Sequence, residues 1–442
     1  MTVCFLLFQQ FDLFHTFISS YAYLGGHFVD FYDFNKQAVG GNDYLPLIYI
    51  FFAIWNLPLY FLDLIPSVTN ITLNVDELPH QLQKIDLTLQ LAWSKLLIVI
   101  LFFASAQVLG KISIELKKDC EVIQSRSPEI LFLTAPLAIF AIFILGQYDI
   151  FSVFFTLLGF YYYLKKSFLK FAWFFSIAIS FKYFALVIYI PLLLMIEKNL
   201  IRICKYFLIG ISVILTQFIF YWHSQIFREE IFQLLVSKIL IQNNASFKDN
   251  ADSIDPKKIG FCIYYAMICA YLYFKQITND SLWKKLSVFT PVLIYGLMFF
   301  AVSWHPQWLI IVTPFSALAY LYINNSNRFV CSELIGMFAF IWIIVHANIR
   351  NVDGMMLPIG ILRQYIPENI SLAANFLSWL NAPLFIIFFW YAYLFYPVIA
   401  VILQKNVGKN FNQLEMSQNL IFARFIIGTG MFLALALACV LV

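Results

Sequence analysis

Long apolar runs separated by short polar breaks restrict what this chain can fold into more than any other feature. Of its 442 residues, 62% are apolar and 12% are charged, whereas soluble domains average about 45–50% and about 25%. No soluble fold has an interior that could hide so much apolar surface, so the sequence predicts a protein that crosses a lipid bilayer many times. The runs are continuous rather than alternating, which favours α-helical spans over an outer-membrane barrel.

Apolar runs bounded by charged residues give the expected helices. They cover residues 91–110, 129–146, 150–164, 171–181, 183–197, 206–222, 259–274, 287–303, 309–323, 330–346, 377–403 and 419–442. The first apolar stretch, 1–8, is too short to cross a bilayer by itself, because a spanning helix needs about 20 residues. If a first helix is counted there, we expect an all-α polytopic membrane protein with about 13 transmembrane helices.

Lysine and arginine gather in one set of short breaks, which places those breaks in the cytoplasm. This set comprises residues 111–126, 165–170, 198–205, 275–285, 328 and 405–409. The opposite breaks, including 12–90, 223–258 and 347–376, are longer and carry fewer basic residues, so they should face outside. An odd number of crossings must then separate 12 from 111. The proline-containing run 46–65 is therefore expected to be a juxtamembrane or re-entrant helix.

The chain is expected to form a single integral membrane domain, 1–442. Within it, 12–90 would be a large first extracytoplasmic loop with juxtamembrane helices, and 91–442 would be the remaining helix bundle. A net charge of +4 without a long basic tract argues against nucleic-acid binding. The seven cysteines have no disulfide or zinc-ligand spacing, so no metal site is predicted from them.

Lys182 interrupts two apolar helices and is a candidate site residue. The run before it, 171–181, rises only about 16 Å, which is half a bilayer. An ionisable group at that depth needs water, a partner or an anionic ligand, and is a functional candidate by default. The alternative is a lysine whose side chain snorkels to an interface.

Other candidate polar residues lie in the outer set of breaks. They are Asp12, Asp30, Gln147, Asp149, His305 and Gln307. A carboxylate can act as a general base, and lysine or histidine can stabilise a departing phosphate, so this set suits group transfer at a membrane surface. Simpler alternatives exist: Asp149 could cap the next helix, His305 could belong to an interfacial aromatic belt, and Asp30 could be a solvated loop residue. Asp12 is harder to explain this way, because it is embedded in apolar sequence.

Several short motifs carry a resemblance when they are taken in order. In the first loop, Asp12 is followed by Ser20-Tyr21-Ala22-Tyr23-Leu24-Gly25-Gly26, Asp30-Phe31-Tyr32 and Tyr44-Leu45-Pro46-Leu47. Later come Gly146-Gln147-Tyr148-Asp149, Ser180-Phe181-Lys182-Tyr183-Phe184 and Ser303-Trp304-His305-Pro306-Gln307-Trp308. Their order and spacing, from about residue 10 to 320, resemble the C-type (GT-C fold) glycosyltransferases that use polyprenyl-phosphate sugars. That family includes the eukaryotic GPI mannosyltransferase I and bacterial relatives.

The resemblance implies an inverting, mannosyltransferase-like hexosyl transfer outside the cytoplasm. Asp12 would be the general base that deprotonates the hydroxyl of a glycan or lipid-linked acceptor, while polyprenyl phosphate leaves the sugar. Lys182, with His305, would balance the phosphate charge. Gln307, Asp149, Gln147, Asp30, Tyr32 and Tyr44 complete the implied substrate-binding set. Relatives carry Asp-x-Asp where this chain reads Gln10-Phe11-Asp12, so we expect metal-independent chemistry with no cofactor.

Composition rich in Phe, Ile, Lys and Asn suggests a bacterial plasma membrane as the location, with a cell-wall or capsular glycan as acceptor. Two other readings stay open. In a polytopic transporter or lipid/glycan flippase, Lys182 and Asp149 would line the translocation path, although the first-loop pattern has no repeat in the second half. In a polymerase or ligase of surface glycans, the loops 223–258 and 347–376 would contribute. The sugar, the linkage and the oligomeric state are not encoded in any motif.

Overall fold

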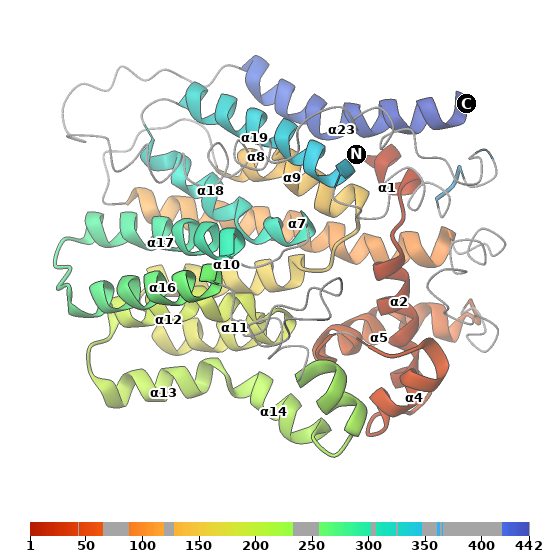
Figure 1. Ribbon diagram of the computed structural model, residues 1–442, viewed down its shortest axis with the longest axis horizontal. Coiled ribbons are helices and arrows are strands. Elements are labelled where there is room, and N and C mark those ends of the chain that lie inside the picture. Colours follow the sequence, from red (N-terminus) through yellow and green to blue (C-terminus); the bar gives the residue numbers. More distant parts are fainter. Residues whose placement is uncertain are drawn as a thin grey trace.

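The computed structural model describes residues 1–42, 44–64, 88–118, 128–232, 256–301, 306–323, 326–346, 360–362, 365 and 418–441. Over these residues the chain is entirely helical, with eighteen α-helices and no strand (Figure 1). The all-α prediction is therefore confirmed for the described part of the chain. The predicted run 377–403 lies outside the described residues.

The first 61 residues form a group of short helices. They are α1 (Thr2–Leu7), α2 (Phe11–Ser19), α3 (Tyr21–Leu24), α4 (Phe31–Val39) and α5 (Pro46–Phe61). Proline at the first position of α5 suits a helix start, because that position needs no backbone N–H. The sequence predicted the helix at 46–65 correctly, and its juxtamembrane placement stays a prediction.

The middle of the chain begins with a long apolar helix, α7 (Thr88–Lys117). It continues with α8 (Pro128–Leu133), α9 (Pro136–Ile139), the π-helix η2 (Phe140–Ile144), α10 (Ile150–Leu164), α11 (Phe168–Phe181), α12 (Phe184–Ile196), α13 (Leu200–Gly210), α14 (Ser212–Tyr221) and the π-helix η3 (Phe227–Phe232). The bounds of α10 match the predicted run, and the predicted break at Lys182 separates α11 from α12.

Three predicted helices are divided in the structure: 129–146, 206–222 and, in the C-terminal part, 309–323. The run 129–146 splits into α8, α9 and η2, because Pro136 has no N–H to continue the first helix. The run 206–222 begins earlier, at Leu200, and is bent by 52° between α13 and α14. At the bend, a Cβ on Gly210 would collide with the ring of Tyr189, so close helix packing requires glycine there.

The C-terminal part packs against the middle helices. It comprises α16 (Pro256–Phe274), α17 (Asp280–Ala301), the 3-10 helix η4 (Pro306–Ile311), α18 (Thr313–Ala319), the 3-10 helix η5 (Tyr320–Tyr322), α19 (Ser326–His346) and α23 (Gln418–Leu441). Of the described helices, α7 and α17 are long and apolar enough to cross a membrane, and α13 with α14 makes a third if the bent pair counts as one span. Shorter apolar helices include α5, α10, α11 and α12.

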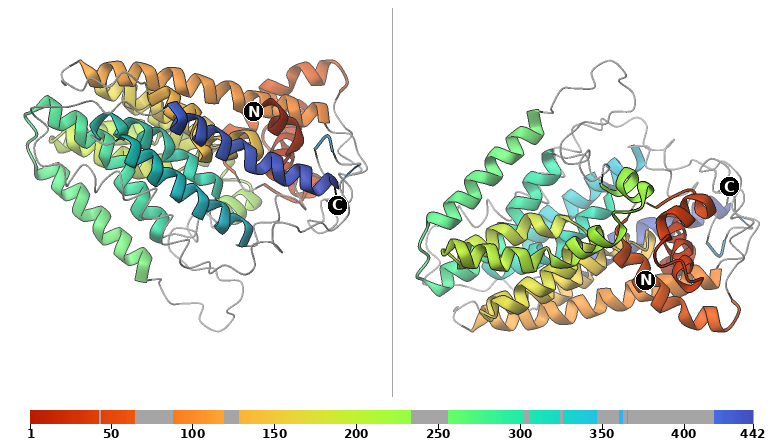
Figure 2. Two further views of the ribbon diagram at one scale, coloured as in Figure 1. Left: turned by 90° about the horizontal axis from the view of Figure 1, so that it is seen from above. Right: turned by 90° about the horizontal axis from the view of Figure 1, so that it is seen from below.

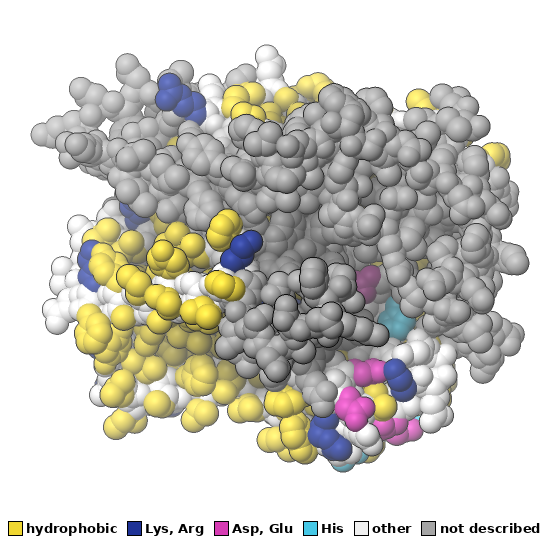
Figure 3. Space-filling view, in the orientation of Figure 1, with side chains coloured by type: hydrophobic (Ala, Val, Ile, Leu, Met, Phe, Trp, Pro, Cys, Tyr) yellow, Lys and Arg dark blue, Asp and Glu magenta, His cyan; other side chains and the backbone are white. Residues whose placement is uncertain are grey.

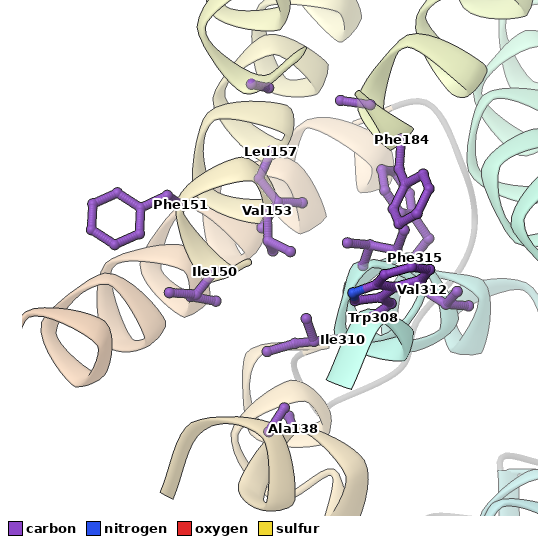
Figure 4. Packing of buried hydrophobic residues seen from close by; sticks show 14 of the residues in the cluster. Ala138, Ile150, Phe151, Val153, Leu157, Phe184, Trp308, Ile310, Val312 and Phe315 are labelled. Carbon is purple, nitrogen blue, oxygen red and sulfur yellow. The ribbon is translucent and has the colours of Figure 1, made fainter. Parts of the chain in front are cut away.

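The helices pack as a bundle with an N-terminal cap at one end. In Figures 1 and 2, α7, α10, α11, α12, α16 and α17 run side by side, whereas α2, α4 and α5 gather at the end of the bundle near α14. Figure 4 shows part of the core: Val153 and Leu157 of α10 face Phe184 of α12 and Trp308 of η4. The Phe184 and Trp308 rings lie 5.0 Å apart at an edge-to-face angle. This packing sets the walls of the site described below.

The surface divides into an apolar and a polar region. In Figure 3, hydrophobic side chains cover the part of this face where Figure 1 places α13 and α16, and charged side chains gather around α4. Exposed side chains on α16 include Ile263, Met267, Tyr271 and Phe274. Such an apolar surface is costly in water, and it is what a helix facing lipid presents.

Candidate functional site

Asp12 lies in the first turn of α2, at the junction between the N-terminal helices and the bundle. Two phenol groups reach its carboxylate from other segments. The Tyr44 hydroxyl donates to Oδ2 at 3.2 Å and lies 3.4 Å from Oδ1, and the Tyr148 hydroxyl lies 3.2 Å from Oδ2. Asp12 is only partly buried, and the two phenol groups orient its carboxylate.

Lys182 has an extended backbone conformation between α11 and α12, and it breaks the apolar helix as the sequence predicted. Its ammonium nitrogen is 3.0 Å from Oδ1 of Asp149, and both side chains are buried. Asp149 is the N-cap residue of α10, as the helix-cap alternative expected, but its side chain makes no cap hydrogen bond and pairs with Lys182 instead. The snorkelling alternative for Lys182 is wrong, because the ammonium is enclosed by protein and paired.

Three aromatic rings enclose the Lys182 ammonium. The ring centroids lie 5.2 Å away for Tyr44, 5.8 Å for Phe184 and 5.0 Å for Trp308. Each ring presents negative charge density to the cation, and these contacts stabilise an ammonium that has little access to water. The second oxygen of Asp149, Oδ2, accepts no hydrogen bond within the described chain. The pair therefore keeps unused hydrogen-bonding capacity.

Tyr44 joins the two charged groups. Its hydroxyl contacts the carboxylate of Asp12, and the face of its ring contacts the ammonium of Lys182. Its backbone oxygen accepts a 2.8 Å hydrogen bond from the fully buried Tyr32, which fixes the position of Tyr44. The ring of Tyr44 also packs edge-to-face on Tyr148 at 5.0 Å. Asp12 and Lys182, 170 positions apart in the sequence, thus lie on two sides of one side chain.

The remaining predicted site residues lie further from this centre. Asp30 is exposed and accepts a 2.9 Å hydrogen bond from His27, which lowers the pKa of its carboxyl group. Gln147 is fully buried, and neither polar atom of its side chain has a partner among the described residues. Gln307 is buried next to Trp308 in η4, and His305 lies outside the described residues. No contact joins Asp30 to Asp12, so these two acids form separate environments.

The sequence did not identify Tyr148 as a hydrogen-bond partner of Asp12. The residue belongs to the quoted motif Gly146-Gln147-Tyr148-Asp149, but only the polar neighbours were singled out. Gly146 adopts φ 65°, a conformation that favours glycine. This turn directs Tyr148 toward Asp12 and Asp149 toward Lys182. One tetrapeptide therefore supplies a partner for each of the two charged groups. The only available signal was the tight turn between two apolar helices.

The structure also contains an apolar groove of about 420 Å³. Its walls come from α3, the loop after it, α5 and α14. The lining residues are Tyr23, Leu24, Phe28, Pro46, Ile50, Ala53, Ile54, Leu57, Thr216, Gln217, Phe220 and Tyr221. Pro46 lies two residues after Tyr44, and Gln217 accepts a hydrogen bond from the backbone N–H of Leu47 at 3.1 Å. The groove therefore begins next to the segment that carries Tyr44.

The first loop is held against the chain after α14 by a network of polar contacts. The Tyr23 and Tyr221 hydroxyls lie 2.8 Å apart, and Ser224 donates to Asp33 at 3.1 Å. Lys36 forms an ion pair with Glu230 at 2.5 Å. These contacts fix the loop that bears Tyr44 over the bundle.

In the described part of the chain, no three histidine, cysteine, aspartate or glutamate side chains are grouped closely enough to hold a metal ion. No protein-family model matches the chain, and neither does any curated protein or solved structure.

Proposed function

We propose that this protein is an integral membrane glycosyltransferase of the GT-C type that transfers a hexosyl group from a polyprenyl-phosphate donor to a glycan or lipid-linked acceptor. Asp12 is its general base and the anomeric configuration inverts. The observation that carries the proposal is the position of Tyr44, which contacts the Asp12 carboxylate with its hydroxyl and the Lys182 ammonium with its ring. A base and a cation on either side of one aromatic residue suit a reaction between a hydroxyl group and a phosphate ester.

The reaction assigns one step to each group. Asp12 removes the proton of the acceptor hydroxyl as its oxygen bonds to the anomeric carbon. The bond between that carbon and the phosphate oxygen breaks, and the electron pair leaves with polyprenyl phosphate. Lys182 balances the charge on this phosphate. Because Asp149 already holds one side of the ammonium, the phosphate shares the cation with a carboxylate, and its hold on Lys182 is weaker than an unpaired lysine would give.

The apolar groove supports a lipid-linked substrate. Its rim includes exposed side chains of α5 and α14, such as Ile54 and Phe220, and exposed apolar residues continue along both helices. A hydrocarbon chain placed there would bury apolar surface while its head group approaches the segment with Tyr44. We further propose a plasma-membrane location, with the site on the extracytoplasmic face and about 13 spans in the bundle.

The substitution Asp12→Asn tests the proposal. The full-length protein is reconstituted in vesicles with a panel of undecaprenyl-phosphate sugars and an acceptor glycolipid fraction, and release of undecaprenyl phosphate is followed. We expect one donor to be consumed by the wild type and its turnover to fall about 100-fold or more in the variant, because general-base catalysis contributes about 10²–10⁴. Donor binding should change by less than about twofold, since the amide keeps the shape of the carboxylate.

Asp63→Asn is the matched control, because Asp63 is an exposed acid of the same N-terminal region. It should leave turnover unchanged. If Asp12→Asn retains turnover within about threefold of the wild type, Asp12 is not the base.

The buried pair of Lys182 and Asp149 also supports a second candidate, a transporter or flippase with this pair in its path. Flux of a labelled lipid-linked sugar across the vesicle membrane without release of polyprenyl phosphate would favour it. In that case Lys182→Met should stop the flux and Asp12→Asn should not.

A further inference from the structure

Lys95 is a buried cation that the proposed reaction does not use. It lies about two turns into α7, and its side chain has no exposure to solvent. Its ammonium donates to three backbone oxygens, those of Phe8 at 2.6 Å, Phe5 at 3.3 Å and Ile144 at 3.4 Å. No carboxylate pairs with it anywhere in the described chain.

The three acceptors belong to the C-terminal ends of two short helices. Phe5 and Phe8 lie in and just after α1, and Ile144 is the last residue of η2. Carbonyl groups at a helix C-terminus have no partner within the helix and carry partial negative charge. One ammonium with three N–H groups satisfies three such oxygens, which explains how a lysine is kept in an apolar helix without an acid.

The two segments that Lys95 joins are each followed, within four residues, by a residue of the candidate site. Four residues after Phe8 comes Asp12, and four residues after Ile144 comes Tyr148. Gly146 packs on the same lysine: a Cβ at this position would lie 3.2 Å from its Cε and 3.0 Å from Leu13, the neighbour of Asp12. The lysine stem, the turn at Gly146 and the start of α2 therefore form one packed contact.

We propose that Lys95 is a positioning residue that holds Asp12 of α2 against Tyr148 of the turn after η2. The proposal rests on the proposed function for its catalytic consequence, but the junction itself is a structural claim. Loss of the ammonium removes the hydrogen bonds that join the end of α1 to the end of η2. The 3.2 Å contact between Tyr148 and Asp12 is then no longer fixed, and the carboxylate loses its orientation toward the acceptor.

The test uses Lys95→Met, Lys95→Arg and Ser94→Ala in the reconstituted full-length protein. Methionine keeps most of the volume but donates no hydrogen bond, whereas arginine keeps the charge and the donors. Ser94 is the matched control, because it is the buried neighbour of Lys95 and its hydroxyl has no partner among the described residues. Backbone hydrogen exchange is measured by mass spectrometry, together with kcat and KM for the donor that the wild type consumes.

For Lys95→Met we expect faster exchange in peptides covering 5–16 and 140–149, with α16 unchanged. We also expect a fall in kcat of about 30-fold with KM within about twofold, since a misplacement of about 1 Å costs up to about 10²-fold in rate. Lys95→Arg should recover kcat to within about fivefold of the wild type, and Ser94→Ala should match it in every measurement. If Lys95→Met does not accumulate, Gly146→Ala, which pushes on the same contact, should give the same local pattern.

Unchanged exchange in both peptides overturns the proposal, and so does an unchanged kcat alongside faster exchange. A uniform rise in exchange over all helices without rescue by arginine also overturns it, because it shows a role in global stability alone. If the wild type consumes no donor, the proposed function fails, and the exchange data still decide whether Lys95 joins the two segments.

Discussion

Two buried ion pairs of this protein differ in how completely they are satisfied. Arg424 of α23 donates to both carboxylate oxygens of Glu333 in α19, at 2.6 and 2.8 Å. Its remaining N–H groups reach Thr134 at 2.6 Å and the backbone oxygen of Leu131 at 2.9 Å. Lys182 has one carboxylate oxygen at 3.0 Å and otherwise aromatic faces.

The Arg424–Glu333 pair holds helices together, whereas the Lys182–Asp149 pair can also accept a ligand. Arg424 joins three helices, and both oxygens of Glu333 accept hydrogen bonds, so little capacity remains for another molecule. Around Lys182, Oδ2 of Asp149 has no partner among the described residues, and the ammonium has donors that meet only rings. A buried polar group without a partner costs free energy, and such groups persist where a ligand or water completes them.

The largest expected effect is a loss of stability at the Arg424–Glu333 pair. Arg424→Met leaves Glu333 as an unpaired buried charge, so we expect the protein to lose about 3–5 kcal/mol of unfolding free energy. Donor turnover at a permissive temperature should stay within about twofold of the wild type, because this pair lies among α8, α19 and α23. Thermal denaturation in detergent and the turnover assay measure the two quantities. If Arg424→Met instead weakened donor binding and left stability unchanged, the Arg424–Glu333 pair would not be purely structural.

At the Lys182–Asp149 pair, we expect substitutions to affect stability and donor binding differently. Lys182→Met leaves Asp149 unpaired and should cost up to about 3–5 kcal/mol. The double variant Lys182→Met, Asp149→Leu removes both charges and should recover most of that stability, yet donor binding should remain at least about tenfold weaker than in the wild type. Melting temperature and donor titration are compared for the same three proteins. Recovery of donor binding in the double variant would show that Lys182 does not meet the phosphate.

The smallest effect is expected at Tyr44, where one substitution separates its two contacts. Tyr44→Phe removes the hydroxyl that meets Asp12 and keeps the ring over Lys182. We expect a stability loss of about 0.5–1.5 kcal/mol, which is typical of one hydrogen bond. Turnover should fall about three- to tenfold, while donor affinity remains within about twofold. Weaker donor affinity with normal turnover would mean that Tyr44 serves Lys182 rather than Asp12.

The sequence predicted those features that depend on local pattern. The break at Lys182 followed from a charge between two apolar runs, and α10 followed from an uninterrupted run between Asp149 and Lys165. The kink at Pro136 was missed, although the loss of a backbone N–H at proline was readable. Features that depend on which helices meet were out of reach: no pattern places Tyr148 beside Asp12 or assigns the carbonyl groups around Lys95.

The dual contact of Tyr44 limits how this position can change during evolution. Phenylalanine offers the ring without a hydroxyl, and serine or threonine offers a hydroxyl without a ring, so either replacement keeps only one of the two contacts. Tryptophan has both a face and a donor, but its larger indole would have to displace Tyr148, whose ring lies 5.0 Å away. Among homologous chains that keep an acid at position 12 and a lysine at 182, tyrosine at 44 should vary less than its neighbours.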